Sequence, residues 1–364
     1  MSAQSSGHLQ INLKAIQENY SYLDSLSAPS CETAAAIKAD AYGTGIAQVA
    51  PALFEASARR FFVATLDEGI ALREILPEAK IYILNGFAPE GDEYSANNLI
   101  PVLNSLSDIA GHTHYARVKE KKLPAVIHFD TAMNRLGLND EETFILDHNH
   151  DMLDPLEIDF FMSHFASSDE AGNPSIHNQF LKFKGIYHTF LDTKTSLCNS
   201  SGIFRDISYH LDITRPGIAL YGGNPTPETD NPMSPAINLS VPALQIKNVK
   251  KNETCGYGET YCFEKNTALA TVSLGYADGF FRSLGNKGKL YWKNYELPIR
   301  GRVSMDLVIC DLENVPENDY PKPYDMIEVI GKNQSIDDLA RDAETISYEI
   351  LTALGPRYKR TYII

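Results

Sequence analysis

One lysine stands out because of its neighbours. Lys38 follows an apolar run and precedes a tyrosine and two glycines, in the segment AAAIKADAYGTG at positions 34–45. Burial disfavours the charged form of a lysine and lowers its pKa, and the neutral amine is a nucleophile toward carbonyl carbon. A lysine at the end of a buried strand is therefore a candidate for a Schiff base. The alternative is a lysine whose stem lies on apolar surface while its amine reaches water, and the local pattern alone favours this alternative.

Other polar residues follow predicted strands further along the chain. They are Tyr42 after the first strand, Arg135 after the fifth, His164 at the end of the sixth, Asn199 and Ser200 at the seventh, and Arg215, Gly217 and Ile218 at the eighth. A lone histidine or arginine at a strand end is more often a structural residue. In a parallel barrel, however, the carboxyl ends of all strands face one mouth, where the active sites of such barrels lie. The shared position therefore favours one functional site.

Three of these residues suit a phosphate group. The hydroxyl of Ser200 and the backbone N–H groups near Gly217 and Ile218 are of the kind that phosphates bind. Phosphate sites in barrels commonly use the loops after strands seven and eight. A lysine together with a phosphate site indicates pyridoxal 5′-phosphate, held as a Schiff base on Lys38.

The elements that must position these residues are short apolar runs alternating with amphipathic segments. Eight runs lie at 33–37, 60–65, 80–84, 99–103, 125–129, 156–162, 195–198 and 211–214. Segments 66–76, 107–119 and 178–191 between them have helical spacing, and a strand near 9–13 with a helix over 15–26 precedes them all. Strands that alternate with helices in this way predict an α/β fold with an N-terminal (β/α)8 TIM-like barrel.

The pattern changes after about position 221. Residues 222–235 are rich in turn formers and indicate a linker. Beyond it, β-branched runs lie at 239–249, 267–274, 289–292, 307–311 and 326–330, and one closing helix is expected over 336–354. These runs predict a mostly-β C-terminal domain, so we place the barrel domain at 1–230 and the β domain at 231–364.

The composition limits the classes of partner. The chain has 364 residues, and its formal net charge of −15 without a basic tract argues against nucleic acid or an anionic membrane as partner. No signal peptide is apparent at the start, and no apolar run is long enough to span a bilayer. The five cysteines are an odd number and lack CxxC spacing. A reduced, cytoplasmic protein without disulfides or a metal site is therefore expected.

Six motifs resemble those of the alanine racemase family of fold-type III pyridoxal-phosphate enzymes. In order along the chain they are IKADAYG at 37–43, MSHFA at 162–166, RPGIALYG at 215–222, GYGETY at 256–261, LGYADG at 274–279 and GRVSMD at 301–306. The resemblance implies an isomerase that interconverts L-alanine and D-alanine with pyridoxal phosphate and supplies D-alanine for peptidoglycan. It also implies a homodimer in which the β domain of one subunit caps the barrel of the other, so that the active sites are shared.

The resemblance also implies a role for each matching residue. Lys38 would carry the cofactor and act as base on the D-alanine face, and Tyr257 would act on the L-alanine face from the second subunit. The remaining assignments are Tyr42, Ser200, Gly217 and Ile218 for the phosphate, with Asn199 in the same cofactor-binding set; Arg215 for the pyridine nitrogen, with His164 nearby; Arg135 and the backbone of Met305 for the substrate carboxylate; and Tyr276 for the entry channel.

This division of roles agrees with the chemistry of racemisation. The Cα proton must leave from one face and return to the other, which two flanking acid–base groups accomplish. A tyrosine ordinarily titrates near pH ~10, so Tyr257 would need neighbouring positive charge or hydrogen bonds, which His164 with Arg215 could supply. Arginine has no acceptor, so Arg215 can only donate to the pyridine nitrogen.

The chain departs from the family pattern at three positions. Many relatives have a lysine in place of His128, and its carbamylated form orients the arginine that matches Arg135. A histidine cannot be modified in this way, so either a bound anion such as chloride or another acidic side chain is expected to orient Arg135. Pro356 stands where some relatives have a phosphate-binding tyrosine, so Tyr358 is left out of the phosphate set. Ser304 replaces a frequent cysteine, with little expected effect on catalysis.

Three alternatives share parts of these motifs. A broad-specificity racemase of the same fold is commonly exported, which the start of this chain does not favour. A fold-type III decarboxylase is usually longer and lacks the tyrosine of the GYG segment at 256–258. A non-catalytic pyridoxal-phosphate carrier has the barrel alone, whereas this chain continues through a domain with Tyr257 and Met305. Substrate breadth and a biosynthetic or catabolic role stay open.

Overall fold

The computed structural model describes residues 7–87, 91–190 and 193–364, and their contacts divide the chain into two compact units. The barrel unit consists of Ile16–Leu220 and Asn224–Met233. The β unit consists of Met1–Ala15, Tyr221–Gly223 and Ser234–Ile364. This division differs from the predicted boundary after position 230, because the first strand of the chain belongs with the C-terminal residues.

A parallel sheet that returns on itself forms the centre of the barrel unit. Its order is β2-β10-β9-β8-β7-β6-β5-β4-β3. The strands are β2 (Glu32–Thr33), β3 (Ala35–Ala36), β4 (Arg60–Val63), β5 (Lys80–Ile83), β6 (Leu99–Leu103), β7 (Leu123–His128), β8 (Leu156–Met162), β9 (Thr195–Ser196) and β10 (Ile213–Thr214). Only Ala34 separates β2, which pairs with β10, from β3, which pairs with β4. β2 and β3 therefore act together as one barrel strand, and the barrel closes with eight strand positions. This confirms the predicted fold class.

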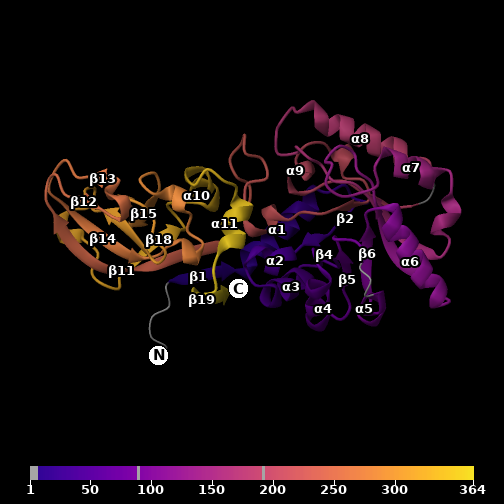
Figure 1. Ribbon diagram of the computed structural model, residues 1–364, viewed down its shortest axis with the longest axis horizontal. Helices are drawn as coiled ribbons and strands as arrows, with labels where there is room; N and C mark the ends of the chain where they lie inside the picture. Colours follow the sequence, from indigo (N-terminus) through magenta and orange to yellow (C-terminus); the bar gives the residue numbers. More distant parts are fainter. Residues whose placement is uncertain (1–6, 88–90, 191–192) are drawn as a thin grey trace. The chain divides into compact units, whose positions relative to one another are not determined.

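Helices lie outside these strands (Figure 1). They include α1 (Leu13–Leu26), α3 (Ile46–Glu55), α4 (Leu66–Ile75), α5 (Gly91–Ala96), α6 (Leu106–Val118), α7 (Asp140–Asp147) and α8 (Pro174–Tyr187). The segments predicted at 66–76 and 107–119 correspond to α4 and α6. The segment predicted at 178–191 corresponds to α8, which begins earlier because Asn173 caps it and a proline occupies its first turn. Leu191 lies outside the described residues.

A charged cluster lies at the amino ends of the barrel strands. Arg60 forms ion pairs with Glu32 at 2.5 Å and with Asp159 at 2.6 Å, and it also contacts the hydroxyl of the buried Tyr82. That hydroxyl donates to Asp159 at 2.5 Å. Burial alone would raise the pKa of Asp159, but hydrogen bonds from Tyr82 and Arg60 outweigh burial and hold the pKa below its usual value. The cluster therefore stabilises the folded barrel while Asp159 is ionised.

Asp159→Asn is expected to lower the free energy of unfolding at pH 7 by about 3 kcal/mol, because it leaves the buried Arg60 charge with fewer partners. The pKa of Asp159 is lower in the folded state than in the unfolded state, so its stabilisation is present above about pH 4 and is lost as the pH falls through the folded value. The difference between wild type and variant should therefore shrink below about pH 4 in urea titrations. Asp92→Asn, at an exposed ion pair with Lys119, is the control and should change little. A constant difference at all pH values would contradict this role.

An eight-stranded sheet forms most of the β unit. Its strands are β1 (His8–Asn12), β11 (Ile237–Val249), β14 (Thr267–Ser273), β15 (Lys289–Trp292), β16 (Tyr295–Pro298), β17 (Leu307–Asp311), β18 (Met326–Ile330) and β19 (Lys359–Ile363). The hairpin of β12 (Thr254–Cys255) and β13 (Tyr261–Cys262) is separate. β1 pairs with β11 on one side and with β19 on the other. This pairing is the reason that the first strand belongs to the β unit.

The predicted C-terminal elements differ from the structure at one helix. The single helix expected over 336–354 is two helices, α10 (Ile336–Asp342) and α11 (Ser347–Ala353). Between them Glu344 has a φ of 61°, a left-handed conformation that a right-handed helix cannot include. The five predicted strands match β11, β14, β15, β17 and β18 to within two residues, whereas β16 and β19 were not predicted.

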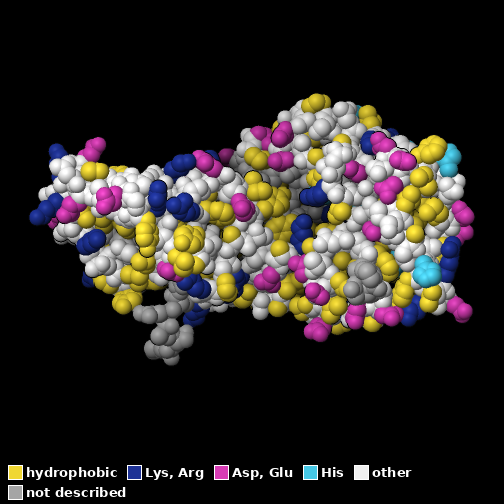
Figure 2. Space-filling view, viewed as in Figure 1, with side chains coloured by type: hydrophobic (Ala, Val, Ile, Leu, Met, Phe, Trp, Pro, Cys, Tyr) yellow, Lys and Arg dark blue, Asp and Glu magenta, His cyan; other side chains and the backbone are white. Residues whose placement is uncertain are grey.

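Acidic and basic side chains are interspersed over the visible face (Figure 2). Within residues 7–87, 91–190 and 193–364, no helix has both the length and the apolar character needed to cross a membrane.

Candidate active site

The predicted barrel residues all follow the carboxyl ends of parallel strands. Lys38 comes two residues after β3, His164 two residues after β8, and Arg215 directly after β10. Asn199 and Ser200 follow β9, and the loop with Arg135 follows β7. Carboxyl ends of parallel strands lie at one mouth of a barrel. The structure therefore places these residues at one end of the barrel unit.

Lys38 lies at the start of an unusual turn. The four residues after it, from Ala39 to Tyr42, have φ values of 53–55°, a left-handed turn built without glycine. Gly43 continues it with a φ of 76°. The pKa of Lys38 is lowered: burial has the largest effect, Arg135 adds to it and Glu68 opposes it. A lower pKa favours the neutral, nucleophilic form of the amine.

A group of hydroxyls and backbone N–H groups converges near Gly217. Ser200 Oγ accepts from Gly217 N at 2.9 Å and from Ala219 N at 3.3 Å. A Cβ built at position 217 would collide with the hydroxyl of Tyr42, so the hydroxyl approaches the backbone as closely as only glycine permits. Ile218 begins the short 3-10 turn Ile218–Tyr221 beside them. These donors fit a phosphate group.

The side chain of Asn199 caps a short helix. Its Oδ1 accepts from Gly202 N at 3.0 Å and from Ser168 Oγ at 2.7 Å, so it caps the helix α9 (Ser200–Ile203). The cap fixes the backbone that carries Ser200. Asn199 thus fixes the backbone of Ser200, one of the residues predicted to bind the phosphate.

Arg215 crosses the interior of the barrel mouth. Its Nη2 donates to Ser163 O at 2.6 Å and lies 3.3 Å from His164 Nδ1, and its Nη1 donates to the hydroxyl of Ser196. Burial lowers the pKa of Arg215 to about 10, so it stays charged at neutral pH. Burial first, and then Arg215 and Arg135, lower the pKa of His164 well below its usual value. The site therefore combines a fixed cation with a neutral imidazole.

His128 is a neutral, internally bonded side chain. Its Nδ1 lies 2.7 Å from Asn104 Oδ1, and burial, followed by the charge of Arg215, lowers its pKa to about 3. The carboxylate of Asp130 accepts hydrogen bonds from the backbone N–H groups of residues 132–134, so these contacts occupy it. Arg135 itself is exposed and has no ion pair within residues 7–87, 91–190 and 193–364. No described acidic side chain therefore orients Arg135.

The other predicted residues lie in the β unit. Tyr276 N donates to Ser304 O at 3.1 Å and Ala277 N donates to Met305 O at 3.0 Å, so the structure brings Tyr276 and Met305 onto adjacent turns. Tyr257 lies between Gly256 and Gly258, whose φ values are 71° and 72°. Tyr257, Met305 and Tyr276 are exposed by 74%, 54% and 47%, which is high for large apolar side chains.

Two residues of the site region were missed in the sequence. Glu68 accepts a hydrogen bond from Ala39 N at 2.6 Å. The spacing of Glu68 from Thr65 indicates a capping box in the sequence. It does not indicate the contact with Ala39, which lies 29 positions away. Arg357 pairs with the buried Asp278 and with Asp306, each at 2.7 Å, and so ties together the two turns that carry Tyr276 and Met305.

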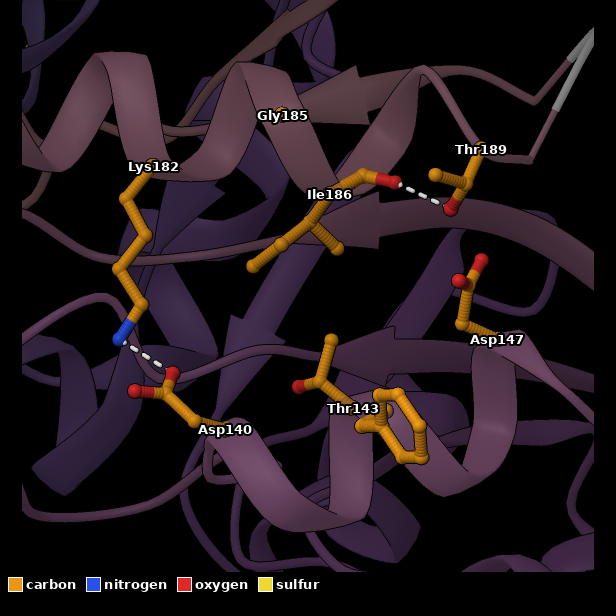
Figure 3. A pocket seen from close by; sticks show the side chains of 8 residues that line it. Asp140, Thr143, Asp147, Lys182, Gly185, Ile186 and Thr189 are labelled. Carbon is orange, nitrogen blue, oxygen red and sulfur yellow. Dashed lines mark hydrogen bonds and ion pairs between the residues drawn. The ribbon is translucent and has the colours of Figure 1, made fainter.

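Two other features lie apart from these residues. Tyr358 is buried and packs near Gly7 in the β unit. A hollow of about 270 Å³ lies between α7 and α8 on the outer wall of the barrel, with an ion pair of Lys182 and Asp140 at one end (Figure 3). None of its eight lining residues is a predicted site residue.

Comparisons with known proteins agree over both units. The family model described as "Alanine racemase, N-terminal domain" matches residues 11–225, and "Alanine racemase, C-terminal domain" matches residues 236–362. A protein of Agrobacterium fabrum named "Alanine racemase, catabolic" is 45% identical over 361 residues, which cover 98% of this chain and 92% of that protein. An alanine racemase of Brucella canis is 42% identical over 372 residues, which cover 98% and 93% of the two chains.

Solved structures show the same fold. The alanine racemase of Bartonella henselae, crystallised with covalently bound pyridoxal phosphate, matches with a TM-score of 0.95 and 38% identity over 99% of this chain and 100% of that chain. The biosynthetic alanine racemase of Pseudomonas aeruginosa matches with a TM-score of 0.91 and 29% identity over 99% and 100% of the two chains.

Proposed function

Because this chain belongs to the alanine racemase family, we propose that it interconverts L-alanine and D-alanine with pyridoxal phosphate carried by Lys38. The observation that carries the proposal is a half-buried lysine of lowered pKa at the same barrel mouth as the donors near Gly217 and the cation Arg215. These groups fit the aldehyde, the phosphate and the ring nitrogen of the cofactor. When bound, pyridoxal phosphate withdraws electrons from the substrate and makes its Cα proton acidic.

The residues of the barrel unit hold the cofactor and one proton position. Tyr42, Ser200 and the backbone of Gly217 and Ile218 bind the phosphate, with Asn199 fixing their backbone. Arg215 donates to the ring nitrogen and cannot take up a proton there, since a guanidinium has no acceptor. Lys38 Nζ removes the Cα proton of D-alanine, and in the reverse direction it delivers the proton to that same face. His164 is neutral, so it adds no second positive charge near Lys38.

Tyr257 is the proposed acid–base group on the L-alanine face. It is supported by its place on an exposed turn whose glycines, Gly256 and Gly258, lie next to Arg302, because such a surface suits contact with another chain. We place the three predicted site residues of the β unit over the barrel mouth of a second subunit, in a homodimer with two shared active sites. Tyr276 then lines the entry channel.

Arg135 and the backbone N–H of Met305 bind the substrate carboxylate in this proposal, and a small anion such as chloride orients Arg135. Replacing chloride by gluconate at constant ionic strength is expected to raise the KM for alanine severalfold with little change in kcat, because uniform binding is lost. Arg135→Gln should raise the KM and abolish its dependence on chloride. An unchanged wild-type KM in both salts would contradict the anion.

The cellular setting is also a proposal. The absence of a helix that could cross a membrane, within the described residues, is compatible with a cytoplasmic enzyme. A role in supplying D-alanine for peptidoglycan rests on the family, whose members include proteins named catabolic and biosynthetic.

Incubation of the purified protein with L-alanine in D2O tests the function directly. We expect D-alanine that carries deuterium at Cα, approaching an equal mixture of the enantiomers. Release of carbon dioxide instead would indicate a decarboxylase, and cofactor binding without any exchange at Cα would indicate a carrier. Either result would overturn the proposed activity.

A further inference from the structure

The carboxylate of Glu68 joins two segments that are distant in the sequence. Its Oε2 accepts from Ala64 N at 2.7 Å and from Thr65 N at 3.3 Å, at the start of α4. Its Oε1 accepts from Ala39 N at 2.6 Å. Charge-assisted hydrogen bonds of this length are among the stronger ones in proteins. One side chain thus links the cap of α4 to the residue that follows Lys38.

Ala39, whose N–H donates to Glu68, is the first residue of the left-handed turn. A left-handed conformation costs roughly 1–2 kcal/mol for each residue other than glycine, and such strain persists only where the surroundings hold it. The later part of the turn is held from within, by Gly43 N to Ala39 O at 2.8 Å and by Ile46 N to the carboxylate of Asp40 at 2.7 Å. Its first N–H is held from outside, by Glu68.

The turn sets the spacing of two site residues. It lies between Lys38 and Tyr42, and the hydroxyl of Tyr42 reaches the backbone of Gly217. A right-handed course over the same four residues would carry the two side chains in different directions. The geometry of the mouth therefore depends on the strained conformation of residues 39–42.

We propose that Glu68 is a positioning residue, which fixes the left-handed turn so that Lys38 and Tyr42 meet the same cofactor. The proposal rests on the proposed function of this site. Glu68 also acts on Lys38 through its charge: it opposes the effects of burial and of Arg135 on the amine. Loss of the carboxylate should therefore change both cofactor binding and the pH at which the lysine-bound cofactor changes its protonation.

Three variants separate this role from ordinary stabilisation of α4. Glu68→Gln removes the charge and one acceptor. Thr65→Ala removes the other half of the capping box and leaves the contact with Ala39 intact. Asp67→Asn removes an exposed carboxylate from the same first turn. The readouts are thermal unfolding, the Kd for pyridoxal phosphate by fluorescence, and the pH midpoint of the absorption band of the lysine-bound cofactor.

Glu68→Gln is expected to weaken binding of pyridoxal phosphate about tenfold, the effect of one charge-assisted hydrogen bond, and to move the pH midpoint downward. Thr65→Ala should lower thermal stability without either change, and Asp67→Asn should resemble wild type. Equal effects of Glu68→Gln and Thr65→Ala on cofactor binding, or no effect of Glu68→Gln, would overturn the proposal.

Glu68→Asp provides a second variant in case Glu68→Gln does not fold. It keeps the charge but is one methylene shorter, so we expect weaker cofactor binding with a pH midpoint near that of wild type. Unchanged binding would overturn the positioning role. A wild-type protein that binds pyridoxal phosphate but does not racemise alanine would contradict the proposed function alone, because these readouts concern the cofactor on Lys38.

Discussion

Lys38→Ala should lose racemisation of alanine in both directions by a factor of about 10³ or more. A positioned general acid–base group alone contributes typically about 10²- to 10⁴-fold, and Lys38 is also the proposed covalent attachment of the cofactor. No other described lysine shares its setting of burial, Arg135 and Glu68 at the barrel mouth. The measurement is chiral chromatography of alanine after incubation with excess pyridoxal phosphate.

Lys182→Ala is the matched control for this variant. Lys182 lies on the outer wall of the barrel, where it pairs with Asp140 (Figure 3). It should keep full activity, and both variants should unfold at temperatures near that of wild type. Activity of Lys38→Ala close to that of Lys182→Ala would show that the central assignment is wrong.

Tyr257→Phe is expected to reduce racemisation by roughly 10²- to 10⁴-fold while leaving proton exchange on the D-alanine face intact. If Lys38 serves the D-alanine face, the variant should still exchange the Cα proton of D-alanine with solvent deuterium, whereas L-alanine should exchange poorly. Proton NMR in D2O measures both rates. Tyr324→Phe, at another exposed tyrosine of the β unit, is the control. Loss of exchange from both enantiomers would contradict the division of faces.

Mixing the two inactive variants tests the shared active site. In a C2 dimer that exchanges subunits freely, half of the dimers contain one copy of each variant, and each mixed dimer has one intact site if Tyr257 acts on the partner's barrel. An equal mixture of Lys38→Ala and Tyr257→Phe should therefore regain about a quarter of wild-type activity. A mixture without activity, although an affinity tag on one variant retains the other and so shows mixed dimers, would place Tyr257 in the active site of its own chain.

The sequence predicted which residues follow the barrel strands better than it predicted the turn that follows Lys38. Alternating apolar runs placed Lys38, His164, Ser200 and Arg215 after strands, and strand ends are set by local patterns that a sequence displays. The left-handed turn at residues 39–42 could not be predicted in this way, because none of its residues is the glycine that usually marks such a conformation. Its first N–H donates to the distant Glu68, a contact that no local pattern displays.

Other differences have the same origin in long-range contacts. The pairing of β1 with β19 joins the two ends of the described chain, and no local pattern in either strand specifies its partner. The division of the predicted helix at 336–354 depends on the backbone conformation of Glu344. The partners of His128 were likewise set by the fold, since Asn104 comes from a neighbouring strand end. The structural setting of a residue could therefore be predicted where it depends on residues that are close in the sequence.

The position of β1 has a consequence for how the molecule is assembled. His8 lies within 2.7 Å of Thr361, although 353 positions separate them. The sheet of the β unit therefore cannot be completed until nearly the whole chain has left the ribosome, whereas all strands of the barrel have emerged long before. Contacts between such distant residues form slowly, because the intervening chain must first be ordered. The barrel with Lys38 can fold early during synthesis, and the sheet of the β unit is finished last.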